Sequence, residues 1–282
     1  MDINWSYKNK SRVFDTKENG GVPYLSFKAL DDTGLAVNGF STRMGGASRG
    51  KFSTMNFSYS RGDAAEDVLE NFTRMAAALG VERDRMVVSH QTHTVNLRRV
   101  TLEDAGKGVI RERDYRDIDG LITDVPGLTL VTFYADCVPL YLLDPVNRAI
   151  GLSHSGWRGT VKRMGQVMVD AMKEAFGTKP EDLIACVGPS ICRDCFEVGG
   201  EVVEEFREAF GPEHREALYC QGKRPGKYQL DLWKANEIIF REAGICRENI
   251  HITNICTMCN SDYLFSHRKV GEERGNLAAF LC

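Results

Sequence analysis

The chain has 282 residues, of which 43% are hydrophobic and 27% are charged. These fractions are ordinary for a globular protein, and they exclude disordered, collagen-like and coiled-coil chains. Because the net charge is only −3, the chain lacks the overall basic character of a nucleic-acid binder, and we predict no nucleic-acid partner. No run approaches about 18 consecutive apolar residues, so we predict no membrane span.

The cysteine count and the first residues predict the compartment. The N-terminal segment has neither an apolar stretch nor a small-residue cleavage site, so we expect no signal peptide. Nine cysteines is an odd number, and without a signal it predicts reduced thiols in the cytoplasm rather than a disulfide framework. The sequence does not determine the oligomeric state, for which we favour a monomer.

The length allows one large domain or two small ones. We find no internal repeat and no linker long enough to separate two domains, so we predict an N-terminal arm over 1–34 and one domain over 35–282. The first 30 residues resemble either a peripheral arm or a pair of strands. A strand over 35–41 is expected to end in a glycine-rich turn at 42–46.

A helix is predicted next along the chain. Asp63 is the candidate N-cap, Glu66 completes a capping box, and Gly80 follows the helix as its C-terminal stop. Apolar residues recur at helical spacing between these ends and form one face, consisting of Val68, Leu69, Phe72, Met75, Ala76 and Leu79.

The second half of the chain alternates between strand and helix patterns. A second amphipathic helix is predicted to end before Gly177, and two later helices are predicted over 200–210 and 232–243. Because runs of adjacent strands are mixed with separate helices, we predict an α+β fold with mixed, largely antiparallel sheets packed against helices. The second helix carries Val161, Met164, Met168, Ala171, Met172 and Phe176, and the β-rich runs are 86–88, 121–123, 128–134, 138–143 and 149–153.

One predicted hairpin brings two chemically reactive residues together. Asp-Pro-Val-Asn at 144–147 suits a type I turn. If residues 144 and 147 close the hairpin, Cys137 lies directly opposite His154, with Cβ atoms about 4.5–5.5 Å apart. Pro139 cannot donate a hydrogen bond to a neighbouring strand, so we expect this strand to be an edge strand or to be frayed at that end.

A thiolate and an imidazole at that range have two main uses. They can share a zinc ion, which binds nitrogen and sulfur donors, or they can form a nucleophile and its base. His93, which follows the strand at 86–88, is the best-placed third ligand. Three protein ligands with an open fourth position are typical of catalytic zinc. The spacing alone leaves open that Cys137 is a small buried residue and His154 a core histidine.

Several motifs, in order from about residue 35 to the C-terminus, resemble the laccase-domain family, also called multicopper polyphenol oxidase-like. This family is associated with purine nucleoside phosphorylase and adenosine deaminase activity, and some bacterial members are called peptidoglycan editing factors. The matching segments are Ser-Thr-Arg-Met-Gly-Gly at 41–46, Gln-Thr-His at 91–93, Ala-Asp-Cys-Val-Pro at 135–139, His-Ser-Gly-Trp-Arg-Gly at 154–159, Val-Gly-Pro-Ser at 187–190, Phe-Glu-Val-Gly at 196–199, Cys-Thr at 256–257 and Phe-Ser-His-Arg at 265–268.

The resemblance implies the site and the chemistry. The family's zinc ligands, which are also its catalytic residues, fall on His93, Cys137 and His154. The implied reactions are phosphorolysis of adenosine, inosine and methylthioadenosine, and hydrolytic deamination of adenosine. Purine nucleosides and phosphate are therefore the expected partners, and zinc the expected cofactor, with a single copper ion as the alternative metal.

Phosphate requires cationic side chains or backbone N–H donors. Arg43 lies in a glycine-bearing turn that could form an anion-binding nest, and Arg158 begins the second amphipathic helix, whose N-terminus favours anions. Arg268 is a third candidate. Asn56 and Gln91 are candidates for purine or ribose contacts.

Three further residues near these motifs are assigned lesser roles. We take His90 as a structural neighbour of His93 rather than a ligand. Asp136 either orients a ligand or caps a turn. Asp119, followed by Gly120, is expected to serve a turn rather than the chemistry.

Other functions remain open at this point. A true multicopper oxidase needs roughly ten histidines for its copper sites, and the chain has six, so this function is excluded. A cysteine hydrolase would use Cys137 as nucleophile and His154 as base, as an amidase on a peptidoglycan precursor. A third alternative is a non-catalytic zinc-binding module.

Two Cys-x-x-Cys pairs bear on that last alternative. They are Cys192 with Cys195, and Cys256 with Cys259. Such pairs typically form a zinc site when about 15–20 residues separate them, whereas 60 residues lie between these two. We therefore favour reduced thiols at these positions over a four-cysteine zinc site. The family's motif contains Cys256 but does not require the other three.

Overall fold

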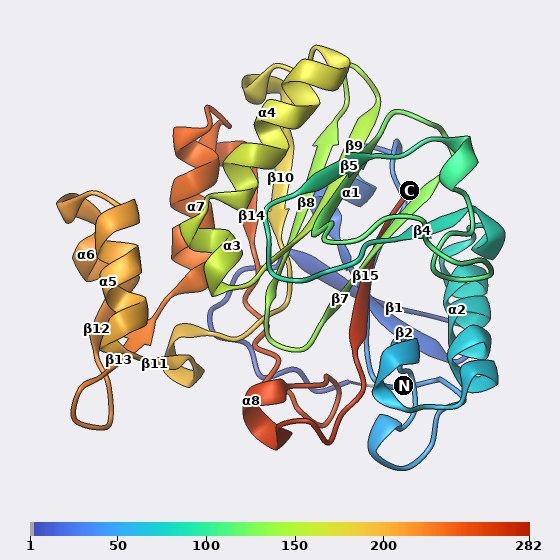
Figure 1. The fold of residues 1–282 in the computed structure, drawn as a ribbon, viewed down its shortest axis with the longest axis horizontal. Coiled ribbons are helices and arrows are strands. Elements are labelled where there is room, and N and C mark those ends of the chain that lie inside the picture. The colour runs from blue at the N-terminus through green and yellow to red at the C-terminus, as the bar shows by residue number, and fades with distance from the viewer. Residues whose placement is uncertain (1–2) are drawn as a thin grey trace.

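The computed structural model describes residues 3–282, and its centre is a pair of six-stranded sheets packed against each other (Figure 1). The first sheet has the order β1 (Phe14–Asn19), β2 (Val22–Phe27), β3 (Asn38–Ser41), β15 (Leu277–Leu281), β7 (Thr129–Tyr134) and β4 (Met86–Val88). The second has the order β14 (Ile250–Ile252), β10 (Ile184–Val187), β8 (Val138–Asp144), β9 (Ala149–Ser155), β6 (Gly120–Thr123) and β5 (Leu97–Arg99).

Helices cover the outer face of each sheet. α2 (Ala65–Leu79) packs on the first sheet, and α4 (Met164–Phe176) and α7 (Leu232–Glu242) pack on the second. A side lobe at the left of Figure 1 is built around the third sheet. It contains β11 (Glu197–Gly199), α5 (Gly200–Ala209), α6 (Arg215–Leu218), β12 (Tyr219–Gln221) and β13 (Lys227–Leu230). The remaining helices are short: α1 (Lys28–Asp31), α3 (Trp157–Val161) and α8 (His267–Val270).

The mixed α+β fold predicted from the sequence is confirmed. Most neighbouring strands are antiparallel, and three pairs are parallel: β4 with β7, β5 with β6, and β10 with β14. Within residues 3–282, none of the helices has the length and apolar character needed to cross a membrane.

Strands in the middle of the sandwich are buried on both faces. In β8, Tyr141 and Leu143 point into the core between the sheets, whereas Leu140 and Leu142 contact the helices outside. Because side chains alternate between faces, a strand with a core on each side must be apolar at every position. This is why the sequence reads here as a continuous hydrophobic run rather than as an alternating pattern.

Two buried tyrosines join the sheets in opposite directions. Tyr141 on the second sheet donates a hydrogen bond to the carbonyl of Gly39 on the first (3.1 Å). Tyr134 on the first sheet donates to the carbonyl of Ser153 on the second (2.9 Å). Burial raises the pKa of both phenols well above the ordinary value, so both remain neutral donors.

The helix boundaries differ from prediction in two places. α2 is capped by Ala64 without a side-chain hydrogen bond, so the predicted capping box is wrong. The Asp63 carboxylate instead accepts from Asn56 Nδ2 (2.8 Å). The second predicted helix is divided into α3 and α4, because Arg163 adopts a left-handed conformation with φ 61°. The Gly80 and Gly177 stops are confirmed, since both are left-handed C-caps.

The hairpin register also differs, by two residues. Asp144 pairs with Ala149, so four residues form the loop and His154 lies opposite Pro139 rather than Cys137. The Asp144 carboxylate accepts the backbone N–H groups of Val146 and Asn147 (both 2.9 Å), which stabilises this longer turn. A shift of two residues preserves the face of each side chain, which is why the predicted proximity survives.

The expectation of an edge strand is wrong, because β8 lies between β10 and β9. Pro139 is tolerated since it lies beyond the last pair of the β8–β10 ladder, Leu140 with Val187. The alternative, a frayed end, is wrong as well, because Val138 and Pro139 pair with Ser155 and His154 of β9, and the Pro139 carbonyl accepts the N–H of Gly188 (2.8 Å).

Replacing Tyr141 with Phe tests the contribution of these inter-sheet hydrogen bonds. We expect Tyr141→Phe to lower the free energy of unfolding by about 1 kcal/mol, because a buried hydrogen bond is lost without a change in packing. Urea denaturation monitored by circular dichroism measures this. Tyr7→Phe, at a phenol that is 54% exposed, is the matched control and should leave the stability unchanged. Equal stability of the two variants would contradict the assigned role.

Candidate active site

His93, Cys137 and His154 converge at one point, as the sequence and the family resemblance predict. Their ligand atoms all lie within 4.8 Å of one another. His93 lies in the loop after β4, Cys137 in the turn between β7 and β8, and His154 near the end of β9. His154 is buried, Cys137 is half-buried and His93 is exposed. The donor set of two nitrogens and one sulfur therefore has a protected side and an open side, which suits a metal ion with a free coordination position.

Backbone geometry makes room for this convergence. His93 and Asp136 have positive φ angles, 66° and 94°, which turn the chain sharply beside the ligands. Gly156 follows β9, and a Cβ atom there would lie 3.1 Å from both Cys137 Sγ and His93 Cδ2. A larger residue at 156 would therefore press on two of the three ligands.

Asp119 holds two of the three ligands in place. Its carboxylate contacts His154 Nδ1 (2.8 Å) and accepts the backbone N–H groups of Thr92, His93 and Thr94 (3.0, 3.1 and 2.9 Å). The carboxylate is fully buried. The expectation that Asp119 only serves a turn is wrong, because the turn it shapes is the one that carries His93. With Nδ1 occupied, His154 directs Nε2 toward the ligand site.

The charges of the site are strongly coupled. Burial raises the pKa of the Asp119 carboxyl, but His154 and the backbone donors lower it to about 2. Burial also raises the pKa of the Cys137 thiol, but His154 and His93 lower it to about 6. Burial lowers the pKa of His154, whereas Cys137 and Asp119 raise it to about 9. The thiolate is thus the favoured form of Cys137, and thiolate is the form that binds metals.

The Asp136 carboxylate binds segments that are distant in the sequence, rather than capping its own turn. It accepts from Thr257 Oγ1 and from the backbone N–H of Arg268 (both 2.6 Å). These contacts join the Cys137 turn to the loop before α8. His90 lines the cavity without belonging to the three-ligand group, and its Nδ1 accepts the backbone N–H of Asp117 (3.1 Å).

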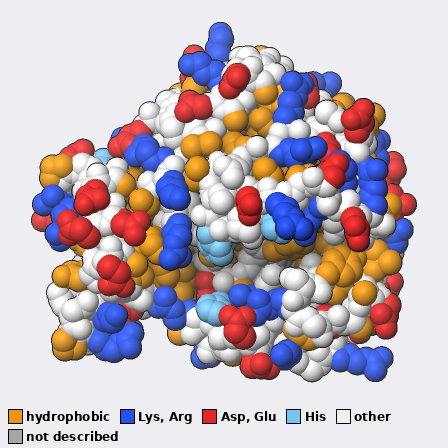
Figure 2. All heavy atoms as spheres, viewed as in Figure 1, with side chains coloured by type: hydrophobic (Ala, Val, Ile, Leu, Met, Phe, Trp, Pro, Cys, Tyr) orange, Lys and Arg blue, Asp and Glu red, His pale blue; other side chains and the backbone are white. Residues whose placement is uncertain are grey.

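The three ligands lie in a cavity of about 410 Å³, which opens on the face shown in Figure 2 as a hollow with histidine, lysine and arginine side chains at its edges. This volume is in the range of small-molecule sites. The aromatic side chains of Phe57, Tyr59 and Phe133 form apolar parts of the cavity wall.

Three arginines that the sequence did not indicate line the cavity: Arg61, Arg113 and Arg274. None of the lining residues in the described chain is acidic. Arg274 Nε is buried and has no hydrogen-bond partner within residues 3–282. Burial and the nearby Arg61 lower the pKa of Arg274 to about 10, and burial also lowers the pKa of Arg113. Both nonetheless remain cations at neutral pH, so the cavity favours an anion.

Of the five predicted substrate contacts, the cavity includes Gln91. Its amide pairs with the backbone of Phe133 through two hydrogen bonds, both 2.7 Å, which fix its position in the wall. Asn56 is fully buried behind the cavity and accepts the backbone N–H groups of Ser58 and Asn276 (3.0 and 2.9 Å).

The structure places the other predicted arginines outside the cavity lining. The Arg43 guanidinium donates to the carbonyls of Ser53 and Ser261 (3.0 and 3.2 Å). Arg158 lies over the ring of Trp157, and Arg268 donates to the carbonyl of Glu197 (2.8 Å). The three arginines of the sequence motifs therefore lie outside the cavity lining, and the arginines of the lining come from segments outside these motifs.

Comparison with known proteins shows the family to which the chain belongs. A family model described as multi-copper polyphenol oxidoreductase laccase matches residues 37–282, and the chain belongs to this family. It is 34% identical over 250 residues to a protein of Geobacillus stearothermophilus named purine nucleoside phosphorylase YlmD, covering 87% of this chain and 89% of that protein. It is also 34% identical to a prokaryotic protein named adenosine deaminase RL5, covering 85% and 91%.

Solved structures show the same fold. The crystal structure of Bacillus licheniformis YfiH matches with a TM-score of 0.88 at 29% identity, covering 96% of this chain and 99% of that one. The structure of YlmD from Geobacillus stearothermophilus matches with a TM-score of 0.86 at 32% identity, covering 95% and 98%. The names of these relatives support an enzyme of nucleoside-processing type.

Asp119→Asn tests how far the ligands depend on this carboxylate. The amide keeps one acceptor oxygen for the backbone but removes the charge that faces His154. We expect the affinity for Zn²⁺ at the three-ligand site to fall about 10–100-fold. Competition against a chromophoric chelator measures the affinity. Asp124→Asn, at an exposed ion pair with Arg99, is the matched control. An unchanged affinity in Asp119→Asn would contradict this assignment.

Proposed function

We propose that the chain is a zinc-dependent purine nucleoside enzyme, which phosphorolyses adenosine, inosine and methylthioadenosine and deaminates adenosine. The observation that carries the proposal is a three-ligand site that opens into a cavity lined by three arginines. An anion and a flat aromatic group bound side by side, such as phosphate and a purine nucleoside, match such a cavity. The named relatives support the same substrate class.

His93, Cys137 and His154 would hold the metal. Zinc held by these residues would supply Lewis-acid chemistry and would activate a water for deamination, in which the water oxygen bonds to C6 of the purine and ammonia leaves. Copper is the alternative metal for the same donors. The closed side of the site, where His154 and Asp119 are buried, keeps the ligand set rigid.

For phosphorolysis, an oxygen of phosphate attacks C1′ of the ribose, and the bond from C1′ to the purine nitrogen breaks. The purine nitrogen leaves with the bonding electron pair. Arg61, Arg113 and Arg274 would hold the phosphate, since arginine pairs with its oxygens through two N–H groups at once. Phe133 and Tyr59 would contact the purine, and Gln91 would form part of the wall beside it.

A second candidate function rests on the proximity of Cys137 to His154, whose Nδ1 contacts the Asp119 carboxylate (2.8 Å). A nucleophile, a base and an orienting carboxylate in this order could act as a cysteine hydrolase, and an amidase on a peptidoglycan precursor is the form we retain. The Cys137 thiolate cannot bind a metal and act as a nucleophile at the same time. The cationic cavity favours the nucleoside enzyme over a non-catalytic zinc module.

We place the protein in the cytoplasm, since all nine cysteines, which lie within residues 3–282, are free thiols.

Product chromatography from adenosine and inosine, with and without phosphate, tests the proposal. We expect adenine and hypoxanthine only when phosphate is present, and inosine from adenosine without it. His93→Ala should lose activity by at least about 100-fold because one metal ligand is removed. His214→Ala, in the side lobe, is the matched control. Absence of turnover in the metal-loaded wild-type protein would refute the nucleoside proposal and favour the cysteine hydrolase.

Arg274→Gln tests the phosphate position. We expect the KM for phosphate to rise about 10–100-fold, because charge-assisted hydrogen bonds contribute about 1.5–3 kcal/mol. The KM for the nucleoside should change much less. Steady-state kinetics at varied phosphate gives both values, and Arg241→Gln, on the exposed surface of α7, is the control. A selective effect on the nucleoside KM would place the phosphate elsewhere.

A further inference from the structure

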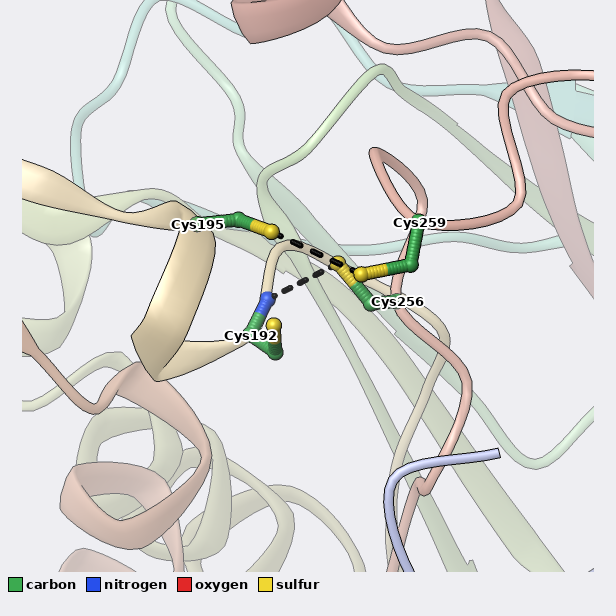
Figure 3. A group of neighbouring side chains, drawn as sticks. All are labelled: Cys192, Cys195, Cys256 and Cys259. Atoms are coloured by element: carbon green, nitrogen blue, oxygen red, sulfur yellow. Dashed lines mark hydrogen bonds between the residues drawn. The ribbon is translucent and has the colours of Figure 1, made fainter. Parts of the chain in front are cut away.

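A second group of metal-ligating side chains lies apart from the cavity. The Sγ atoms of Cys192, Cys195, Cys256 and Cys259 are all within 4.8 Å of one another (Figure 3). None of the four belongs to the cavity lining, and the activity proposed above makes no use of them. The structure therefore brings the two Cys-x-x-Cys pairs into one cluster, despite the 60 residues between them in the sequence.

The topology explains why 60 intervening residues do not separate the pairs. β10 and β14 are parallel neighbours, and one Cys-x-x-Cys pair follows each of them. Parallel strands leave a sheet at the same edge, so the segments that follow them meet, and Ser190 forms a bridge with Cys256. The intervening residues form the side lobe and α7, and the chain then returns to its starting point.

The sulfur spacing matches a single tetrahedral ion. Four Zn–S bonds of about 2.3 Å place the sulfurs about 3.8 Å apart. Cys195 Sγ and Cys259 Sγ are 3.5 Å apart, which is far longer than a disulfide bond of about 2.05 Å. Figure 3 shows the side chains of Cys195, Cys256 and Cys259 pointing toward one another from two separate segments, with Cys192 beside them.

The surroundings suit a negatively charged thiolate cluster. The backbone N–H of Cys192 donates to Cys256 Sγ (3.3 Å). Lys8 is paired with Asp194 (2.8 Å), and its charge also interacts with Cys192 and Cys259. The N-terminal segment is fixed against the cluster's second loop, since Lys8 N donates to the carbonyl of Asn254 (2.8 Å).

We propose that Cys192, Cys195, Cys256 and Cys259 form a structural zinc site, distinct from the three-ligand site of the cavity. Four protein ligands fill the tetrahedron and leave no position for substrate, so the ion stabilises the fold. It would tie together the ends of β10 and β14, the entrance to the side lobe and the N-terminal segment around Lys8. The site does not depend on the proposed activity.

Metal analysis of the purified full-length protein by mass spectrometry tests this. We expect two equivalents of zinc in the wild type and one fewer in the double variant Cys195→Ser/Cys259→Ser. The matched control is Cys220→Ser/Cys246→Ser, which removes two thiols outside the cluster and should keep the wild-type content. Equal zinc in the cluster variant and the control would overturn the proposal.

Thiol reactivity of the wild-type protein gives a test that requires no variant to fold. Cys259 and Cys220 are both exposed, so without a metal both should react with iodoacetamide. With zinc bound, we expect peptide mapping to show Cys259 reacting about ten-fold more slowly than Cys220, and chelation to abolish the difference. Equal rates before chelation, or recovery of Cys195 and Cys259 as a disulfide, would overturn the proposal.

Discussion

The buried carboxylate of Asp119 is the contact on which the candidate active site depends. It lies immediately before β6, and because β6 pairs with β9, it contacts His154 on the neighbouring strand. The same two oxygens accept the N–H groups of the loop that carries His93. One side chain thus fixes both the ring of a buried ligand and the backbone of an exposed one. An ion held by these ligands would therefore be fixed rigidly to the central sheet.

The sandwich positions the third ligand by a different route. Cys137 lies where the chain passes from β7 in the first sheet to β8 in the second. The crossing is fixed on one side by Tyr134, whose hydroxyl reaches the carbonyl of Ser153 beside His154. It is fixed on the other by Asp136 and its contacts to Thr257 and Arg268. Cys137 therefore lies at the junction of the two sheets, where it forms part of the cavity lining.

The sequence allowed the parts governed by local periodicity or by recognisable motifs to be predicted. The apolar face of α2 and the limits of α5 and α7 follow from helical spacing. The ligands His93, Cys137 and His154 followed from the family resemblance, because the register that also pointed to two of them was off by two residues. That error arose from the Asp144 side chain, which stabilises a four-residue loop rather than a two-residue one.

The parts that depend on pairing between distant strands could not be predicted. The role of Asp119 requires knowing that β6 lies beside β9, and the meeting of the two cysteine pairs requires knowing that β10 lies beside β14. Neither strand pairing can be recognised from the local sequence. Arg61, Arg113 and Arg274 come from three loops that only the tertiary fold brings to one cavity.

The side lobe begins and ends at one place, since the N–H of Leu230 donates to the carbonyl of Phe196 (3.0 Å). The lobe is therefore a long insertion whose two ends lie side by side on the body of the protein. The entropic free-energy cost of bringing the two ends of such an insertion together grows only with the logarithm of its length. Each doubling of the length adds about 0.6 kcal/mol. Residues can thus be added to or removed from the tip of the lobe at little cost to the sheets or the active site. In evolutionary terms, this lobe is where the protein is free to acquire a new surface while its chemistry stays unchanged.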